Sequence, residues 1–161
     1  MNYHNITKDD MLNGDGLRVV LWVAGCTHNC LGCHNPQTHD PNSGILFDEA
    51  AKAELFAELS KDYISGITFS GGDPLHESNC NTILNLILEI RKNYPEKTIW
   101  LYTGYTFSQI ENGNNPVRKK IIENIDVLVD GQFVKALADI NYAWAGSTNQ
   151  KVIRLTKSSS R

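Results

Sequence analysis

Apolar positions along the chain fall into short runs of two kinds. Residues 17–25, LRVVLWVAG, form a nearly continuous apolar run rich in β-branched side chains, with a glycine at each end. Such a run predicts a strand buried on both faces. Shorter runs of the same kind recur as GITFS, TIWLYTG, DVLVDG and KVIRL. The pattern therefore predicts five strands, at residues 17–25, 66–70, 98–104, 126–131 and 151–155.

Between these runs the apolar residues recur at helical spacing. Asp48 is a suitable N-cap before an alanine-rich segment, and Ile83, Ile87 and Ile90 lie on one helical face. Pro116 suits the first turn of a helix. The predicted helices cover residues 48–59, 77–93, 106–111 and 116–123, with a short helical piece at 133–137.

Alternation of strands and helices predicts the fold class. It is typical of parallel βαβ units with right-handed crossovers. Five strands are too few to close an eight-stranded barrel, so we expect an α/β fold that forms an open or partial (β/α) barrel of mostly parallel strands. The length of 161 residues suits a single domain over 1–161, with 158–161 as a frayed tail.

Composition and charge exclude several classes of partner. The net charge is −3, whereas nucleic-acid binding usually needs a basic patch; the one basic run, RKK at 118–120, is interpreted as a solvated helix face. No apolar run approaches the roughly 18 residues that a membrane helix requires. The N-terminal residues are polar and do not resemble a signal peptide. We therefore expect a cytoplasmic protein, whose thiols stay reduced.

The cysteines point to a metal or cluster site. Cys26, Cys30 and Cys33 lie in a loop rich in Gly, Asn, Pro and His directly after the first predicted strand. Three thiolates in a C-x3-C-x2-C pattern can bind three irons of a cubane and leave the fourth iron open. An electron-carrying [4Fe–4S] cluster normally has four cysteines. The pattern therefore predicts a cluster with an open coordination position, as catalytic metals keep.

Spacing alone leaves other ligand sets open. Cys80 could be a fourth ligand, although a lone cysteine is more often a small buried hydrophobe. Zinc is also possible, because zinc binds sets of three cysteines and one histidine. His28, His34 and His39 lie in or beside the same loop.

Further polar residues follow the other predicted strands. Gly71, Gly72 and Asp73 come after the second strand, Thr103 after the third and Asp130 at the end of the fourth. In parallel α/β sheets the site lies at the carboxyl ends of the strands, so we expect these residues to meet the cysteine loop. A structural role is the alternative for each: Asp73 would cap a turn, Thr103 would turn the chain and Asp130 would cap a strand end.

Two motifs together resemble the radical S-adenosylmethionine superfamily. The C-x3-C-x2-C loop after the first strand is one, and SGGDP at 70–74 matches the Gly-Gly-Glu motif with Asp73 at the acidic position. More narrowly, the chain is similar to the activating proteins of anaerobic (class III) ribonucleoside-triphosphate reductases, a glycyl-radical-activating branch. The matching pieces are NGDGLR (13–18), GCTHNCLGCHN (25–35), SGGDPLH (70–76), IWLYTGY (99–105), VLVDGQF (127–133) and GSTNQ (146–150).

Two departures from that family pattern concern the site. The family often has an aromatic residue directly after the third cysteine, where this chain has His34. It often has proline between the glycines of the opening motif, where this chain has Asp15. Neither change removes a thiolate. His34 in place of an aromatic residue affects how the adenine of S-adenosylmethionine would pack.

The resemblance implies two cofactors and the residues that bind them. Cys26, Cys30 and Cys33 would bind a [4Fe–4S] cluster. The adenine of S-adenosylmethionine would lie along Gly32, Cys33 and His34. Its methionyl end would meet Gly71, Gly72 and Asp73. Thr103 and Asp130 would contact the cofactor or a cation.

The implied reaction has a protein substrate. One electron from the cluster would split S-adenosylmethionine into methionine and a 5′-deoxyadenosyl radical, which removes a hydrogen atom from a glycine. The implied partners are the large glycyl-radical subunit of the reductase and a flavodoxin-type electron donor. Two alternatives remain: a small radical enzyme acting on a small molecule, and a zinc-stabilised binding module. The TGY, DGQF and GSTNQ pieces favour the reductase-activating interpretation.

Overall fold

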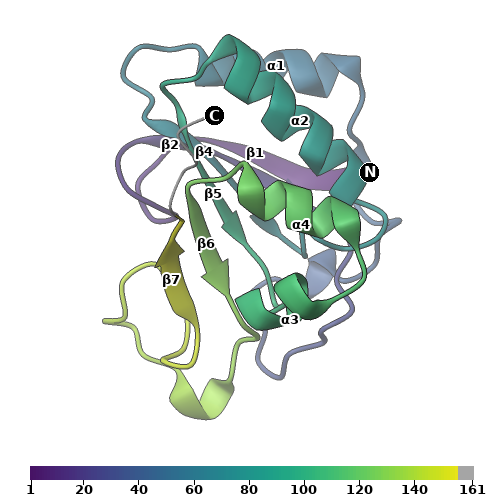
Figure 1. Ribbon diagram of the computed structural model, residues 1–161, viewed down its shortest axis with the longest axis vertical. Helices are drawn as coiled ribbons and strands as arrows, with labels where there is room; N and C mark the ends of the chain where they lie inside the picture. Colours follow the sequence, from purple (N-terminus) through teal and green to yellow (C-terminus); the bar gives the residue numbers. More distant parts are fainter. Residues whose placement is uncertain (156–161) are drawn as a thin grey trace.

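The computed structural model describes residues 1–155, and the tail predicted at 158–161 lies outside this range. A single seven-stranded sheet in the order β3-β1-β2-β4-β5-β6-β7 organises the chain (Figure 1). Within residues 1–155, no helix has both the length and the apolar character needed to span a bilayer. The strands are β1 (Asn2–Asp10), β2 (Arg18–Val23), β3 (Ile45–Leu46), β4 (Gly66–Gly71), β5 (Thr98–Tyr102), β6 (Val127–Asp130) and β7 (Lys151–Arg154).

The sheet is mixed, so the prediction of mostly parallel strands is wrong. The inner pairings β2–β4, β4–β5 and β5–β6 are parallel, as the alternation of strands and helices predicts. The outer pairings β1–β2, β1–β3 and β6–β7 are antiparallel. For β1 and β2 the physical reason is the length of the connection. A parallel pair needs a crossover of a dozen or more residues, whereas β1 and β2 are joined by a short loop that can only reverse the chain.

Two of the seven strands, β1 and β3, are missing from the prediction. β1 is polar, and its buried apolar side chains are Tyr3 and Ile6. These are three residues apart, so a regular strand would place them on opposite faces. A register shift between Tyr3 and Asn5 breaks the alternation, and both side chains reach the same core cluster. The bulge hides the period that identifies a strand in sequence.

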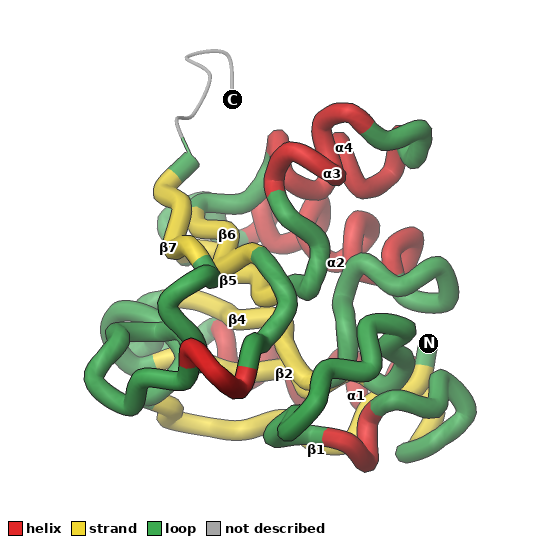
Figure 2. The backbone as a smooth tube through the Cα atoms, turned by 90° about the horizontal axis from the view of Figure 1, so that it is seen from below, coloured by secondary structure: helices red, strands yellow, loops and turns green. Residues whose placement is uncertain are grey.

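The helices pack on one face of the sheet (Figure 2). The predicted helices all form, although α2 begins at Cys80 instead of residue 77. Alternate residues of the parallel strands, such as Leu21, Phe69 and Leu101, join Leu55, Ile87 and other helical side chains in one apolar cluster. The helices are α1 (Glu49–Leu59), α2 (Cys80–Asn93), α3 (Phe107–Asn112) and α4 (Pro116–Glu123), with 3₁₀ turns at Pro36–Thr38 and Lys135–Leu137.

The opposite face of the sheet is more polar and is covered by loops. Arg18 is fully buried there. Its guanidinium donates to Oγ1 of Thr68 at 2.8 Å, to Oγ1 and the carbonyl of Thr98 at 2.8 and 2.9 Å, and to the carbonyls of Asp15 and Ile67. Burial lowers the pKa of Arg18 to about 10. The five hydrogen bonds offset part of the cost of burying this charge.

Candidate functional site

A cavity of about 670 Å³ opens on the loop-covered face, at the carboxyl ends of the parallel strands. Residues that are far apart in sequence line it together. The predicted site residues in its lining are Cys26, Cys30, Cys33, His34, Gly71, Gly72, Asp73 and Thr103. The structure therefore brings the cysteine loop and the Gly-Gly-Asp motif to one place, as expected from their positions after neighbouring strands.

Backbone hydrogen bonds hold the base of the cysteine loop. Gly25 N–H donates to the carbonyl of Thr38 at 2.7 Å, and Cys26 N–H donates to that of His39 at 3.0 Å. On the other side, Asp73 N–H donates to the carbonyl of Gly25 at 2.7 Å. The two ends of the loop thus lie together, directly beside the Gly-Gly-Asp motif.

The glycine pair is required by this close packing. Gly71 has φ +106°, a conformation that side-chain-bearing residues rarely adopt. A Cβ on Gly72 would lie 2.6 Å from the carbonyl oxygen of Gly25. The chain's own packing therefore accounts for both glycines. Their predicted contact with the methionyl end of a cofactor stays a prediction, and their place in the cavity wall is compatible with it.

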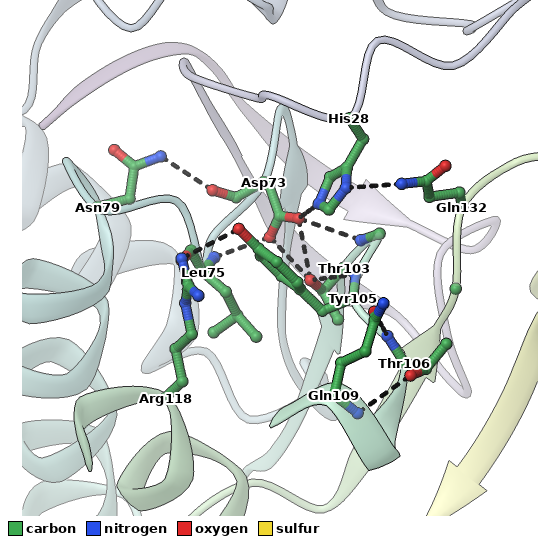
Figure 3. A network of polar contacts seen from close by, with 12 residues as sticks. His28, Asp73, Leu75, Asn79, Thr103, Tyr105, Thr106, Gln109, Arg118 and Gln132 are labelled. Atoms are coloured by element: carbon green, nitrogen blue, oxygen red, sulfur yellow. Dashed lines mark hydrogen bonds and ion pairs between the residues drawn. The ribbon is translucent and has the colours of Figure 1, made fainter. Parts of the chain in front are cut away.

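The carboxylate of Asp73 is a buried hydrogen-bond hub (Figure 3). His28 Nε2 lies 2.6 Å from Oδ2, and Oγ1 of Thr103 lies 2.9 Å from both carboxylate oxygens. The backbone N–H groups of Gly104 and Leu75 donate at 3.1 and 2.8 Å. The bond from Leu75 is the turn cap considered as the alternative role of Asp73. The Thr103 hydroxyl is also engaged here, so both side chains are committed to the protein itself.

Asp130 does not line the cavity. Along β6, Leu128 belongs to the helix-side core, whereas Val129 belongs to the cluster on the other face, and Asp130 has the same parity as Leu128. Its carboxylate accepts the backbone N–H of Phe107 at 2.7 Å and that of Lys151 at 3.2 Å. This is the capping role considered as the alternative, and the placement lends no support to a cofactor or cation contact.

Gly32 and His34 lie at the outer part of the loop. Gly32 is exposed, has φ +75° and borders a smaller neighbouring pocket instead of the main cavity. The His34 ring lies 5.0 Å from the ring of Phe133, and both residues line the main cavity. An aromatic wall is therefore present even though the position after the third cysteine is histidine.

The thiols differ in environment. Cys26, Cys30 and Cys33 are free and half-buried in the cavity wall. Burial raises the pKa of the Cys26 thiol to about 11, and the Asp73 and Cys30 charges add to this rise, while backbone N–H groups oppose it. Cys80 is buried in the helix-side core and is not part of the cavity lining, so it packs as a small hydrophobe.

The histidines considered as zinc ligands are also separated by their contacts. His28 is bonded to Asp73, whereas Nε2 of His39 is buried with no partner among residues 1–155. In that same part of the chain, no three His, Cys, Asp or Glu side chains are placed to hold a single metal ion.

The cavity wall also contains residues outside the predicted site set. Tyr102, Gln132 and Trp22 line it. The Tyr102 hydroxyl is buried and has no hydrogen-bond partner in the described part of the chain, and burial raises its pKa. A buried hydroxyl without a partner costs about 1–3 kcal/mol, so this atom is available to a ligand or a water. Its signal in the sequence was its position, directly before Thr103 at a strand end.

Comparisons with known proteins agree with this site. The family described as 4Fe-4S single cluster domain matches residues 12–153. The anaerobic ribonucleoside-triphosphate reductase-activating protein of Escherichia coli is 42% identical over 96% of this chain and 99% of its own. Those of Vibrio cholerae and Haemophilus influenzae are 38% and 37% identical, over 97% and 96% of this chain and 99% and 98% of their own.

The chain therefore belongs to the 4Fe-4S single cluster domain family, which supports an iron–sulfur cofactor. Within it, the chain belongs to the anaerobic ribonucleoside-triphosphate reductase-activating proteins. This confirms the family that the motifs of the sequence indicate.

Proposed function

We propose that this chain is a radical S-adenosylmethionine enzyme that generates a glycyl radical on the large subunit of an anaerobic ribonucleoside-triphosphate reductase. One observation carries the proposal: the thiols of Cys26, Cys30 and Cys33 line the same cavity as Gly71 and Gly72. The names of the relatives supply the partner. The mixed sheet with helices on one face would correspond to a partial barrel of the radical S-adenosylmethionine type.

The donor set fits a [4Fe–4S] cluster with an open iron. Three free thiols face one cavity, and the fourth cysteine lies in the core. Bound there with S-adenosylmethionine, the cluster would supply the electron that cleaves the cofactor to a 5′-deoxyadenosyl radical. Ligation requires the Cys26 thiol to lose its proton, because the thiolate is the ligand. Because free thiols persist only where the surroundings are reducing, we place the protein in a reducing compartment such as the cytoplasm.

The residues around the thiols would orient the second cofactor. His34 and Phe133 offer ring faces for a flat adenine, next to the backbone of Gly32 and Cys33. Gly71 and Gly72 lie in the cavity wall, where the methionyl end would meet the backbone of the motif. Thr103 and Asp130 would act indirectly, Thr103 through Asp73 and Asp130 by holding the start of α3.

Exposed apolar side chains support a protein substrate. Met11, Leu12 and Ile140 are 67%, 82% and 100% exposed, and all three line the cavity. Large apolar side chains that gather in solvent at the wall of one cavity are typical of interaction sites. We propose that they contact the reductase polypeptide as its glycine loop enters. A flavodoxin-type electron donor remains an expectation from the resemblance.

The test is electron paramagnetic resonance on protein reconstituted anaerobically with iron and sulfide and reduced with dithionite. We expect a reduced [4Fe–4S] signal that changes when S-adenosylmethionine is added. Adding the purified large reductase subunit should then produce a glycyl radical signal, and Cys30→Ala should give neither. Zinc bound without iron would favour the binding module and overturn the proposal. Cofactor cleavage without any radical on the reductase would favour a small-molecule substrate.

A further inference from the structure

One polar network, buried at Asp73 and reaching the surface at Gln132, joins the loops that follow four strands. His28 comes from the cysteine loop after β2, Asp73 follows β4, Thr103 follows β5 and Gln132 follows β6 (Figure 3). The His28 and Asp73 side chains are 8% and 2% exposed. They lie 45 residues apart in sequence and 2.6 Å apart in space. The network therefore lies at the centre of the strand-end surface, beside the cavity.

Apart from the contact of the His34 ring with Phe133, the outer part of the cysteine loop has few contacts that hold it in place. Of the side chains in the segment 26–35, within the described chain, His28 is the one that hydrogen-bonds to a residue outside the loop. Thr27, Asn29 and Leu31 are exposed. The backbone bonds of Gly25 and Cys26 hold the base of the loop and do not restrain its outer part directly.

The surroundings define how the imidazole lies. Gln132 Nε2 lies 3.2 Å from Nδ1 of His28. If the amide donates there, Nδ1 is the acceptor and Nε2 carries the proton that is donated to Asp73. The His28 ring packs edge-on against Tyr105 at 4.6 Å. A Cβ on Gly104 would lie 2.4 Å from the ring. The imidazole thus occupies a close-fitting slot.

We propose that His28 is a positioning residue whose hydrogen bond to Asp73 holds the cysteine loop, and hence the three thiols, over the Gly-Gly-Asp motif. This inference rests on the proposed function, because it concerns how the cluster ligands are arranged. It also assigns Asp73 a different role from the one implied by the resemblance. The Asp73 carboxylate serves the loop, and the cofactor meets the backbone of the motif.

The hydrogen-bond capacity of Asp73 supports this assignment. A carboxylate has about four acceptor positions. His28, Thr103, Gly104 N–H and Leu75 N–H already donate to it. A direct hydrogen bond from the methionyl amine would have to displace one of these donors.

Paired amide substitutions separate positioning from general loss of structure. Glutamine can place an amide nitrogen near the position of histidine Nε2, whereas asparagine reaches only as far as Nδ1. His28→Gln therefore keeps a donor for Asp73, and His28→Asn does not. The control is His4→Asn, which breaks a comparable bond of 2.8 Å between His4 and Ser43 elsewhere in the chain.

Two readouts are measured, the first without any cluster. Hydrogen exchange of the apo protein should be about tenfold faster or more in the segment 26–35 of His28→Asn, because a hydrogen bond to a charged group is lost. It should stay near wild type in His28→Gln and His4→Asn. After reconstitution, His28→Asn should bind less iron per chain and its paramagnetic signal should respond less to S-adenosylmethionine.

The outcomes distinguish this inference from the proposed function. If the wild type binds no cluster, the proposed function fails, and the exchange data still test the bond itself. If the wild type gives a cofactor-sensitive cluster while His28→Asn matches it in exchange, iron content and spectrum, the positioning role is overturned. The positioning role is also overturned if His28→Gln is as impaired as His28→Asn.

Discussion

The two faces of the sheet are built by the same strands and behave differently. On the helix side, Leu21, Phe69 and Leu101 are fully buried among apolar helix residues. On the loop side, the neighbouring residues Trp22 and Tyr102 line a cavity. Because side chains alternate along a strand, a shift of one position moves a residue from the core to the site. One face thus provides stability and the other a place for chemistry.

The difference also appears in how polar groups are treated. Arg18, on the loop side, has five hydrogen bonds and is fully buried. The Tyr102 hydroxyl, on the same face and beside the cavity, has none within residues 1–155. The buried arginine near the start of β2 is thus fully satisfied by the protein, whereas the hydroxyl near the end of β5 is left for a ligand or water to pair with.

The largest expected effect separates the cysteines of the two faces. Cys30→Ala should abolish cluster binding, because one of the three proposed ligands is lost, while the midpoint of thermal unfolding of the apo protein changes little. Cys80→Ala is the matched control and should lower stability by about 1 kcal/mol while keeping full iron content. Iron and sulfide analysis together with thermal unfolding measures both. Iron retained by Cys30→Ala would contradict the ligand assignment.

Next in size is a change confined to the helix-side core. Ile87→Ala removes a fully buried side chain from α2 and should lower the free energy of unfolding by about 2–5 kcal/mol. Leu88, its neighbour on the same helix, is 40% exposed, and Leu88→Ala should cost less than about half as much. Denaturant unfolding measures both free energies. Equal losses of stability in the two variants would show that burial does not decide how much each side chain of α2 contributes.

A smaller loss is expected from the polar side of the sheet. Arg18→Met keeps the volume but leaves the carbonyls of Ile67 and Thr98 without their donor, at a cost of about 1–3 kcal/mol. Arg18→Lys should be more stable than Arg18→Met but less stable than wild type, because one ammonium cannot reach all the acceptors. Denaturant unfolding again gives the comparison. A methionine variant as stable as wild type would mean that the buried cation contributes nothing to stability.

The smallest effect on stability is expected at the rim of the cavity. Ile140→Asp should leave the free energy of unfolding within about 0.5 kcal/mol of wild type, since the side chain is fully exposed. It should raise severalfold the concentration of large reductase subunit needed for half-maximal glycyl radical formation. Leu46→Asp, at an exposed apolar residue of β3, is the control. An equal response to both substitutions would exclude a specific contact at Ile140.

Much of the inner fold could be predicted because burial has a local period. The parallel strands β2, β4, β5 and β6 are short apolar runs, and the helices between them show helical spacing. β1 escaped prediction because it is polar and its bulge breaks the period. The number of parallel pairings was overestimated because β1 and β3 were missed and because β7, although predicted as a strand, pairs antiparallel with β6.

The sequence was sufficient to predict which loops form the site, but not which side chains contact one another there. The amino-acid pattern is enough to show that the cysteines and the Gly-Gly-Asp motif each follow a strand, because a short apolar run directly precedes each of them. The folded chain was needed to show that Asp73 bonds to His28, that Asp130 faces away from the cavity, and that residues 131–146 complete the wall. The physical reason is that hydrogen-bond partners distant in sequence leave no periodic trace in it.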